Sequence, residues 1–213
     1  MKKTIIISVL LILLCLVTFS QEYETKKSND DFKTLLGHDN HSGFYGALTL
    51  GYSVIEDRQA LLFGARFEWI AGHSIGIGFG GTGFLNENHY EPLLNSNVFL
   101  TGGYGGMYIE PIVMPNYPVH LSFPILLGGG GISYVTEDHD YNNNRIEDSE
   151  AFLIAEPGAE IELNLTRFFR LAIGASYRFT TPFDVGTTTP PQTVNSNALR
   201  GFSYMMTFKF GKF

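Results

Sequence analysis

The segment Phe169–Thr180 reads FRLAIGASYRFT, and its side chains change in size and polarity at every second position. One phase is bulky and apolar: Phe169, Leu171, Ile173, Ala175, Tyr177 and Phe179. The other phase is small or charged: Arg170, Ala172, Gly174, Ser176 and Arg178. Successive side chains of a strand point to opposite faces, so this segment predicts a β-strand with two very different faces.

The same alternation recurs along the chain between clusters of turn residues. Eight strands are predicted in total, at Phe44–Ile55, Ala60–Ala71, Ser74–Leu85, Val98–Met114, His120–Val135, Ala151–Leu163, Phe169–Thr180 and Ala198–Phe213. Pro124 and the run Gly128–Gly131 blur the phase of the fifth strand, which predicts a bulge or a sharp bend there.

The links between these strands differ in length in a regular way. Short links occur at Gly72-His73, Pro115–Val119 and Asn164–Phe168, and Glu56–Gln59 is short but highly polar. Long links occur at Asn86–Asn97, Thr136–Glu150 and Thr181–Asn197. Outer-membrane barrels have an even number of strands, short periplasmic turns and longer external loops. The link pattern therefore predicts such a barrel, with both of its ends on the periplasmic side.

A soluble lipocalin-like barrel is the alternative, because it also has eight strands and follows a signal peptide. The size of the two faces decides between them. An eight-stranded barrel has an interior only wide enough for side chains, and the many aromatic residues of the last two strands would crowd it. The sequence thus predicts an all-β fold: an eight-stranded antiparallel up-and-down transmembrane β-barrel after a cleaved signal peptide.

The chain begins with two lysines and an apolar run, which is typical of a secretory signal peptide. We expect residues 1–20 to be the signal peptide, residues 21–42 a flexible periplasmic segment, and residues 43–213 the barrel. A membrane anchor is the alternative, but a spanning helix needs about 20 apolar residues. Removing Lys2 and Lys3 changes the net charge from −7 to −9, and an acidic chain does not suggest nucleic acid. Cys15 is the only cysteine, so the exported form has no internal disulfide.

Charged side chains gather in the small, inward phase of the predicted strands. They are Arg66, Glu68, Glu110, Glu156, Glu160, Glu162, Arg170, Arg178 and Lys209. Across the hairpin of the sixth and seventh strands, Glu162 should lie near Arg170, and Glu156 within diagonal reach of Arg178. Buried charges must be paired, so we interpret this set as a salt-bridged filling of the lumen. A gated pore or a proton path is the alternative.

The link EDHDYNNNRIEDSE concentrates oxygen ligands, and Asp138, Asp140, Asn142, Asn144 and Asp148 are candidates for calcium binding. Asn143 stands where an EF-hand requires glycine, and no Glu follows at the twelfth position. A solvated acidic loop is the alternative, and no other cofactor is expected.

Two His/Ser pairs invite comparison with lipid A-modifying enzymes of the outer membrane. They are His120–Ser122 and His73-Ser74. Both fall at predicted periplasmic ends, whereas lipid A lies in the outer leaflet, so we expect no enzymatic activity.

Several stretches resemble a family of uncharacterised small outer-membrane barrels from Bacteroidota. They are HSGFYGALTLGYSVI, ALLFGARFEWIAGHSIGIGFGGTGF, YGGMYIEPIV and AEPGAEIELNLTRFFRLAIGASYRF. The resemblance implies an eight-stranded barrel but brings no activity. The last strand also resembles the C-terminal signal that the barrel-assembly machinery recognises, with Tyr204, Phe208, Phe210 and Phe213 as its residues. The implied partners are outer-membrane lipid, lipopolysaccharide, that machinery and an unknown extracellular ligand.

Overall fold

The computed structural model describes residues 42–87, 89–91, 96–137, 144–182, 186–188, 191–193 and 197–213. The predicted signal peptide and residues 21–41 of the predicted periplasmic segment lie outside these ranges. Within them, the chain has no helix that is long and apolar enough to cross a membrane.

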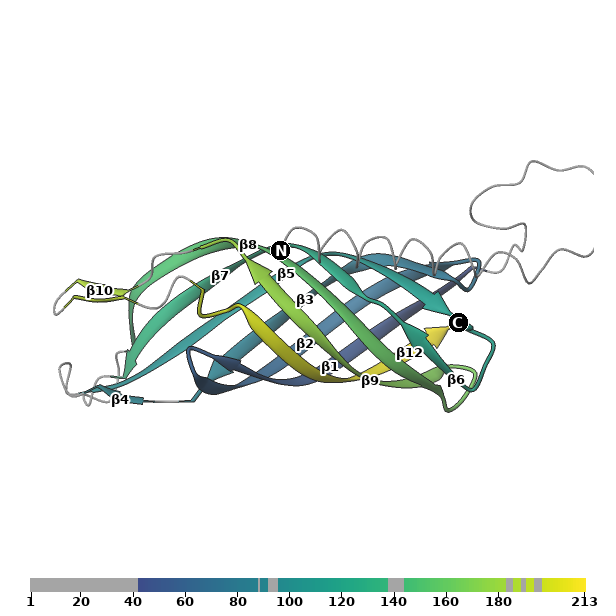
Figure 1. Ribbon diagram of the computed structural model, residues 1–213, viewed down its shortest axis with the longest axis horizontal. Coiled ribbons are helices and arrows are strands. Elements are labelled where there is room, and N and C mark those ends of the chain that lie inside the picture. The colour runs from purple at the N-terminus through teal and green to yellow at the C-terminus, as the bar shows by residue number, and fades with distance from the viewer. Residues whose placement is uncertain are drawn as a thin grey trace, which may run out of the picture.

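The chain forms one antiparallel sheet that closes on itself as a ring of eight long strands (Figure 1). In ring order they are β1 (Gly43–Ile55), β2 (Arg58–Ala71), β3 (Ile75–Asn86), β5 (Ser96–Val113), β6 with β7 (Val119–Ser122 and Ile125–Glu137), β8 (Asn144–Asn164), β9 (Phe169–Thr180) and β12 (Gly201–Lys212). The ring closes where β1 pairs with β12, from Phe44 opposite Lys212 to Ser53 opposite Ser203. The predicted fold is therefore confirmed.

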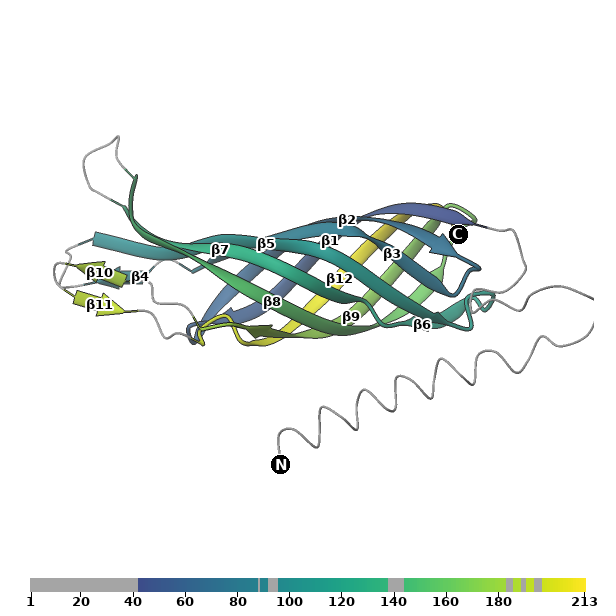
Figure 2. The same cartoon turned by 90° about the horizontal axis from the view of Figure 1, so that it is seen from above.

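The two ends of the barrel are built differently (Figures 1 and 2). One end, here called the short-turn end, carries the C-terminus, β6 and tight turns such as Gly72-His73, both of which have positive φ. The other, the long-loop end, carries β4 (His89–Glu91) and the hairpin of β10 (Gly186–Thr188) and β11 (Pro191–Thr193). The strands therefore have the predicted arrangement, in which short links join them at one end of the barrel and longer links at the other.

The strands of the long-loop end reach farther than the sequence pattern predicts. β7 continues to Glu137 and β8 already begins at Asn144, within the link predicted at Thr136–Glu150. β5, β7 and β8 therefore extend beyond the rim formed by β1, β2 and β12 (Figure 1). The ladder of β7 and β8 changes register between Tyr134 and Val135, which marks a β-bulge in this extension.

A bulge or a sharp bend was predicted around Pro124 and Gly128–Gly131, and the bulge is wrong. The ladder is only interrupted between β6 and β7, because the pairing of both with β8 keeps one register from Ser122 opposite Glu160 to Ile125 opposite Pro157. Proline lacks an amide hydrogen, but its carbonyl oxygen still accepts a hydrogen bond from the Gly158 amide at 2.8 Å. The strand thus passes through Pro124 without an extra residue.

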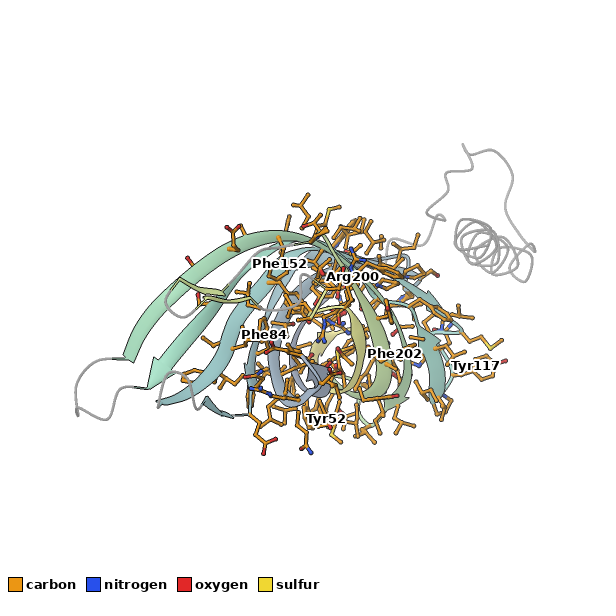
Figure 3. All side chains as sticks on the ribbon, turned by 60° about the vertical axis from the view of Figure 1, so that its left-hand side comes forward. Tyr52, Phe84, Tyr117, Phe152, Arg200 and Phe202 are labelled. Atoms are coloured by element: carbon orange, nitrogen blue, oxygen red, sulfur yellow. The ribbon has the colours of Figure 1, made fainter. Side chains whose placement is uncertain are left out.

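The outer surface of the barrel is apolar. Among the described residues, large exposed apolar side chains come from every long strand of the ring; examples are Phe44, Phe67, Phe79, Leu121, Leu127, Leu153, Ile173, Phe179, Tyr204 and Phe210. Figure 3 shows Tyr117 at the outer edge of the molecule. Tyr117 and Phe202 are each 61% exposed. A bulky apolar exterior over a charged interior is the arrangement that a lipid environment favours.

Candidate functional site

The inward-facing charges form a connected network across the lumen, with Lys209 of β12 at its centre. The Lys209 ammonium group donates to carboxylates of Glu110 on β5 and Glu162 on β8, and lies 3.1 Å from Glu160 Oε2. All four side chains are almost completely buried. One cation from one wall thus ties together three carboxylates from strands on other parts of the ring.

Arg66 of β2 forms a second link between opposite walls. Its Nη2 donates to Glu160 Oε2 at 2.9 Å, and its Nε lies 3.3 Å from Glu68 Oε1 on the same strand. Glu160 therefore binds both Arg66 and Lys209, while Ser122 and Thr207 donate to its two oxygens at 3.5 and 3.4 Å. This carboxylate is fully provided with partners, which is the condition for keeping a charge in the interior.

Glu162 joins the network to the short-turn end. His120 Nε2 lies 3.0 Å from Glu162 Oε2, and Arg170 Nη1 lies 3.5 Å from the same oxygen. The predicted proximity of Glu162 and Arg170 is therefore what the structure shows. Arg170 also stacks its guanidinium over the Phe213 ring, 3.9 Å from the ring centroid.

Tyr45 and His120 belong to this network, although the sequence pattern did not identify them. The Tyr45 hydroxyl donates to Glu110 Oε2, and Tyr45 is 1% exposed. Tyr45 lies in the inward phase of β1, where an aromatic side chain was not expected. His120 was predicted to be the first residue of its strand, at the periplasmic end, and the phase of that strand was unclear around Pro124.

A separate group of polar side chains surrounds Arg178 of β9. Its Nη2 donates to Ser53 Oγ at 2.6 Å and its Nη1 to Ser203 Oγ at 2.9 Å, while its Nε donates to the Leu199 carbonyl oxygen at 2.9 Å. Glu156 instead accepts from Ser176 Oγ at 2.5 Å. The predicted diagonal pair of Glu156 and Arg178 is not among the ion pairs of the described residues. Hydroxyl and carbonyl oxygens satisfy Arg178 instead.

We expect Ser53→Ala to lower the free energy of unfolding by about 2 kcal/mol, the usual contribution of a buried hydrogen bond to a charged group. The substitution removes an acceptor of Arg178 and also the bond from Ser53 Oγ to the Phe202 carbonyl oxygen. Urea unfolding of the refolded barrel measures the change. Ser74→Ala is the control, because Ser74 Oγ bonds only a carbonyl within its own turn; equal losses in both variants would contradict the role of Ser53.

Apolar layers lie on both sides of the charged network. Toward the long-loop end the interior is filled by Ile55, Ala60, Leu62, Phe84, Leu100, Tyr104, Leu126, Ile132, Phe152, Ile154, Ala198 and Leu199. Figure 3 shows Phe84 and Phe152, which are both buried in this layer. Toward the short-turn end, Tyr45, Ala47, Ile70 and Ile112 pack with Phe213.

The space left between these layers is small. A cavity of about 20 Å³ lies beside Arg66, Tyr108 and Glu156, in the middle of the barrel. This volume is close to that needed for one water molecule. The described side chains therefore pack around a polar centre, with room for about one water molecule beside Arg66.

The three carboxylates around Lys209 also have the spacing of a metal site. Ligand oxygens of Glu110, Glu160 and Glu162 all lie within 4.8 Å of one another. The Lys209 ammonium bonds all three, so the position of a metal ion is taken by the protein's own cation. The predicted calcium ligands are elsewhere: Asp138, Asp140 and Asn142 lie outside the described residues, and for Asn144 and Asp148 only the backbone, within β8, is described.

The residues of the predicted assembly signal do not share one face. Tyr204 and Phe210 are exposed on the outward row of β12, and Phe208 lies in the same row. Phe213 has the opposite phase, and its ring packs against Tyr45 with centroids 5.6 Å apart. Recognition of Phe213 by the assembly machinery stays a prediction. The Phe213 ring packs in the interior at the short-turn end of the barrel.

Comparison with known proteins supports the fold. No family model and no curated sequence matches the chain. Among solved structures, Neisserial surface protein A (NspA) is 11% identical, with a TM-score of 0.51, over 81% of this chain and 97% of that one. The N-terminal β-barrel domain of Pseudomonas aeruginosa OprF is 7% identical, with a TM-score of 0.43, over 79% and 96%. Ail of Yersinia pestis, solved with the heparin analogue sucrose octasulfate, is 13% identical, with a TM-score of 0.42, over 80% and 94%. The fold is that of the small eight-stranded outer-membrane barrels.

Proposed function

We propose that this chain is an outer-membrane protein that acts as a structural or surface-binding element and does not conduct solutes. The observation that carries the proposal is the filled lumen, in which Lys209 and Arg66 connect carboxylates across the barrel between two apolar layers. A barrel whose interior is packed has only its ends and its outer wall available for contacts. The apolar outer wall supports placement in a membrane over a soluble, lipocalin-like protein.

Binding would then take place at the long-loop end. That end carries β4, the hairpin of β10 and β11, and the extended strands of β5, β7 and β8 (Figure 2). If the short-turn end is periplasmic, as in other outer-membrane barrels, these elements face the outside of the cell. Lipopolysaccharide and an extracellular ligand are the partners that this placement supports.

Three further parts of the proposal come from the sequence. They are the division into a signal peptide at 1–20, a periplasmic segment at 21–42 and a barrel at 43–213; membership of the Bacteroidota barrel family; and calcium binding by the acidic link, for which a solvated loop remains the alternative. The absence of an enzymatic activity is also an expectation, since His120 and Ser122 contact buried carboxylates of the network.

We expect the refolded protein to give no steady single-channel current in a planar bilayer, because its lumen is packed with side chains. The double variant Glu160→Gln, Glu162→Gln keeps the volume of the network and should be equally silent if it folds. A known porin added to the same bilayer is the positive control. Steady conductance that changes in the double variant would contradict the filled lumen and would make transport the leading function.

A further inference from the structure

An apolar groove interrupts the outer wall where β1 meets its two neighbours. Its volume is about 500 Å³, and its lining residues are Gly46, Ala47, Leu48, Ala65, Arg66, Phe67, Phe79 and Phe210. Ala47 and Arg66 belong to the inward phase, so their side chains face the lumen. The outward side chains that line the groove are therefore all apolar.

The groove exists because Gly46 stands in a row of large side chains. Gly46 pairs with Phe67 on β2 and with Phe210 on β12, and Leu48 follows it in the outward row of β1. A Cβ atom at Gly46 would meet no heavy atom within 4 Å. Neither a tight turn nor a close contact requires glycine at this position. The absence of a side chain at Gly46 therefore leaves open space between the neighbouring aromatic side chains.

A basic residue lies beyond the lining of the groove, on its short-turn side. Lys212 is exposed in the same outward row of β12 as Phe210, and it pairs with Phe44 next to Gly46. A second cation, Arg167, is in the adjoining turn, where the Phe168 carbonyl accepts from the Gly211 amide at 2.9 Å. The surface thus offers an apolar groove with exposed cations beyond its short-turn side.

We infer that this groove binds one anionic phospholipid of the leaflet at the short-turn end, with an acyl chain against Gly46 and Ala65 and the phosphate group at Lys212. The inference rests on the membrane placement proposed above. Small residues on a lipid-facing wall let an apolar chain approach the backbone closely. A lysine near the headgroup region attracts anionic lipid, and a single residue contributes about 1 kcal/mol.

The same positive charge argues against a second copy of the barrel as the occupant. A two-fold symmetric interface places the same patch of both subunits together. Centred on the groove, it would bring the two Lys212 side chains toward each other beside an apolar contact. A lipid instead supplies the opposite charge at the end of its acyl chain.

The only tryptophan of the chain allows a direct test. Trp69 is 48% exposed, pairs with Phe44 and follows Phe67 in the outward row of β2. Its fluorescence in vesicles of brominated phosphatidylcholine is quenched by neighbouring acyl chains. Adding unbrominated phosphatidylglycerol should restore fluorescence with about a fivefold preference over unbrominated phosphatidylcholine.

Three variants separate the groove from a general charge effect. Gly46→Leu places a side chain in the groove, where its Cβ atom would meet no heavy atom within 4 Å, and Lys212→Gln removes the cation; each should abolish the preference. Gly131→Leu, on β7 across the ring, is the matched control and should keep it, because the nearest atom to its Cβ would be the Glu150 carbonyl oxygen at 3.7 Å. Circular dichroism confirms that each variant is folded.

Each other result overturns the inference. A preference lost in Lys212→Gln but kept in Gly46→Leu would indicate ordinary attraction of lipid to a charged rim. A change of oligomeric state in Gly46→Leu, seen by sedimentation in detergent, would indicate a second copy as the occupant. If no brominated lipid quenches Trp69 in the folded wild-type protein, the membrane placement itself is wrong.

Discussion

Replacing Lys209 with methionine should lower the free energy of unfolding of the barrel by about 3–5 kcal/mol, the range found when one partner of a buried ion pair is removed. Methionine has a similar length, so the loss comes from charge and not from packing. Glu110, Glu160 and Glu162 would be left with one fewer cation, although their side chains are almost completely buried. Equilibrium urea unfolding in lipid vesicles, followed by Trp69 emission, measures this change.

Lys212→Met is the matched control, because Lys212 is exposed in the outward row three residues later. We expect it to change the stability by less than about 0.5 kcal/mol in vesicles of phosphatidylcholine alone, where no anionic lipid is present for Lys212 to attract. A double-mutant cycle of Lys209→Met with Glu162→Gln should show coupling, since the second change removes one of the carboxylates left unpaired. If the two variants Lys209→Met and Lys212→Met have the same free energy of unfolding, Lys209 is not the centre of the network.

Replacing Ile173 with arginine should lower the free energy of unfolding in vesicles by about 2–4 kcal/mol, the cost of arginine at mid-membrane depth on the lipid face of a barrel. Ile173 lies in the middle of β9, is 53% exposed and pairs with Met206 and Ile161, which are also outward and apolar. In water the same substitution on an exposed strand position would cost little. The measurement therefore tests the membrane placement of the barrel wall.

Gln59→Arg serves as the control for this prediction. Gln59 is exposed in the outward row of β2 at the long-loop end, beyond the apolar band. We expect its substitution to be nearly neutral, because the cost of a charge falls to about 0–1 kcal/mol near the membrane interfaces. If Ile173→Arg is tolerated as well as Gln59→Arg, the outer wall faces water and the soluble, lipocalin-like alternative gains support.

The faces of the strands could be predicted from the sequence because alternation is a local property. The bounds of β9 were predicted to the residue, and all nine predicted inward charges are buried. Which charges meet was less predictable, since it depends on the tilt and stagger of the closed ring. Glu162 met Arg170 as a diagonal neighbour on the adjacent strand, because Arg170 pairs with Asn164, two residues after Glu162. Glu156 and Arg178 instead found separate partners in Ser176 and Ser53.

The apolar filling of the long-loop half was not predicted, although its residues are in the inward phase. Leu62 is about as large as its lipid-facing neighbours Leu61 and Phe63, and Phe84 is larger than Gly83 and Leu85, so the expected alternation by size is absent there. The role of His120 was hidden for a related reason, because Pro124 and the glycines after it obscured the phase of β6 and β7. The partners of Leu62, Phe84 and His120 lie on distant strands, so the local sequence pattern does not reveal their roles.

The charged network also constrains the order in which the barrel can be made. Arg66 and Glu160 are separated by 94 residues, and Lys209 and Glu110 by 99, so both pairs await strands from distant parts of the chain. A sheet that entered the bilayer one hairpin at a time would carry unpaired charges past the acyl chains, at a high cost in free energy. Neutralisation requires the last strand, which brings Lys209 and completes the seam with β1. We therefore expect the sheet to curl into a barrel as it enters the bilayer. The strands near the N-terminus would become stable only once the strands near the C-terminus have joined them.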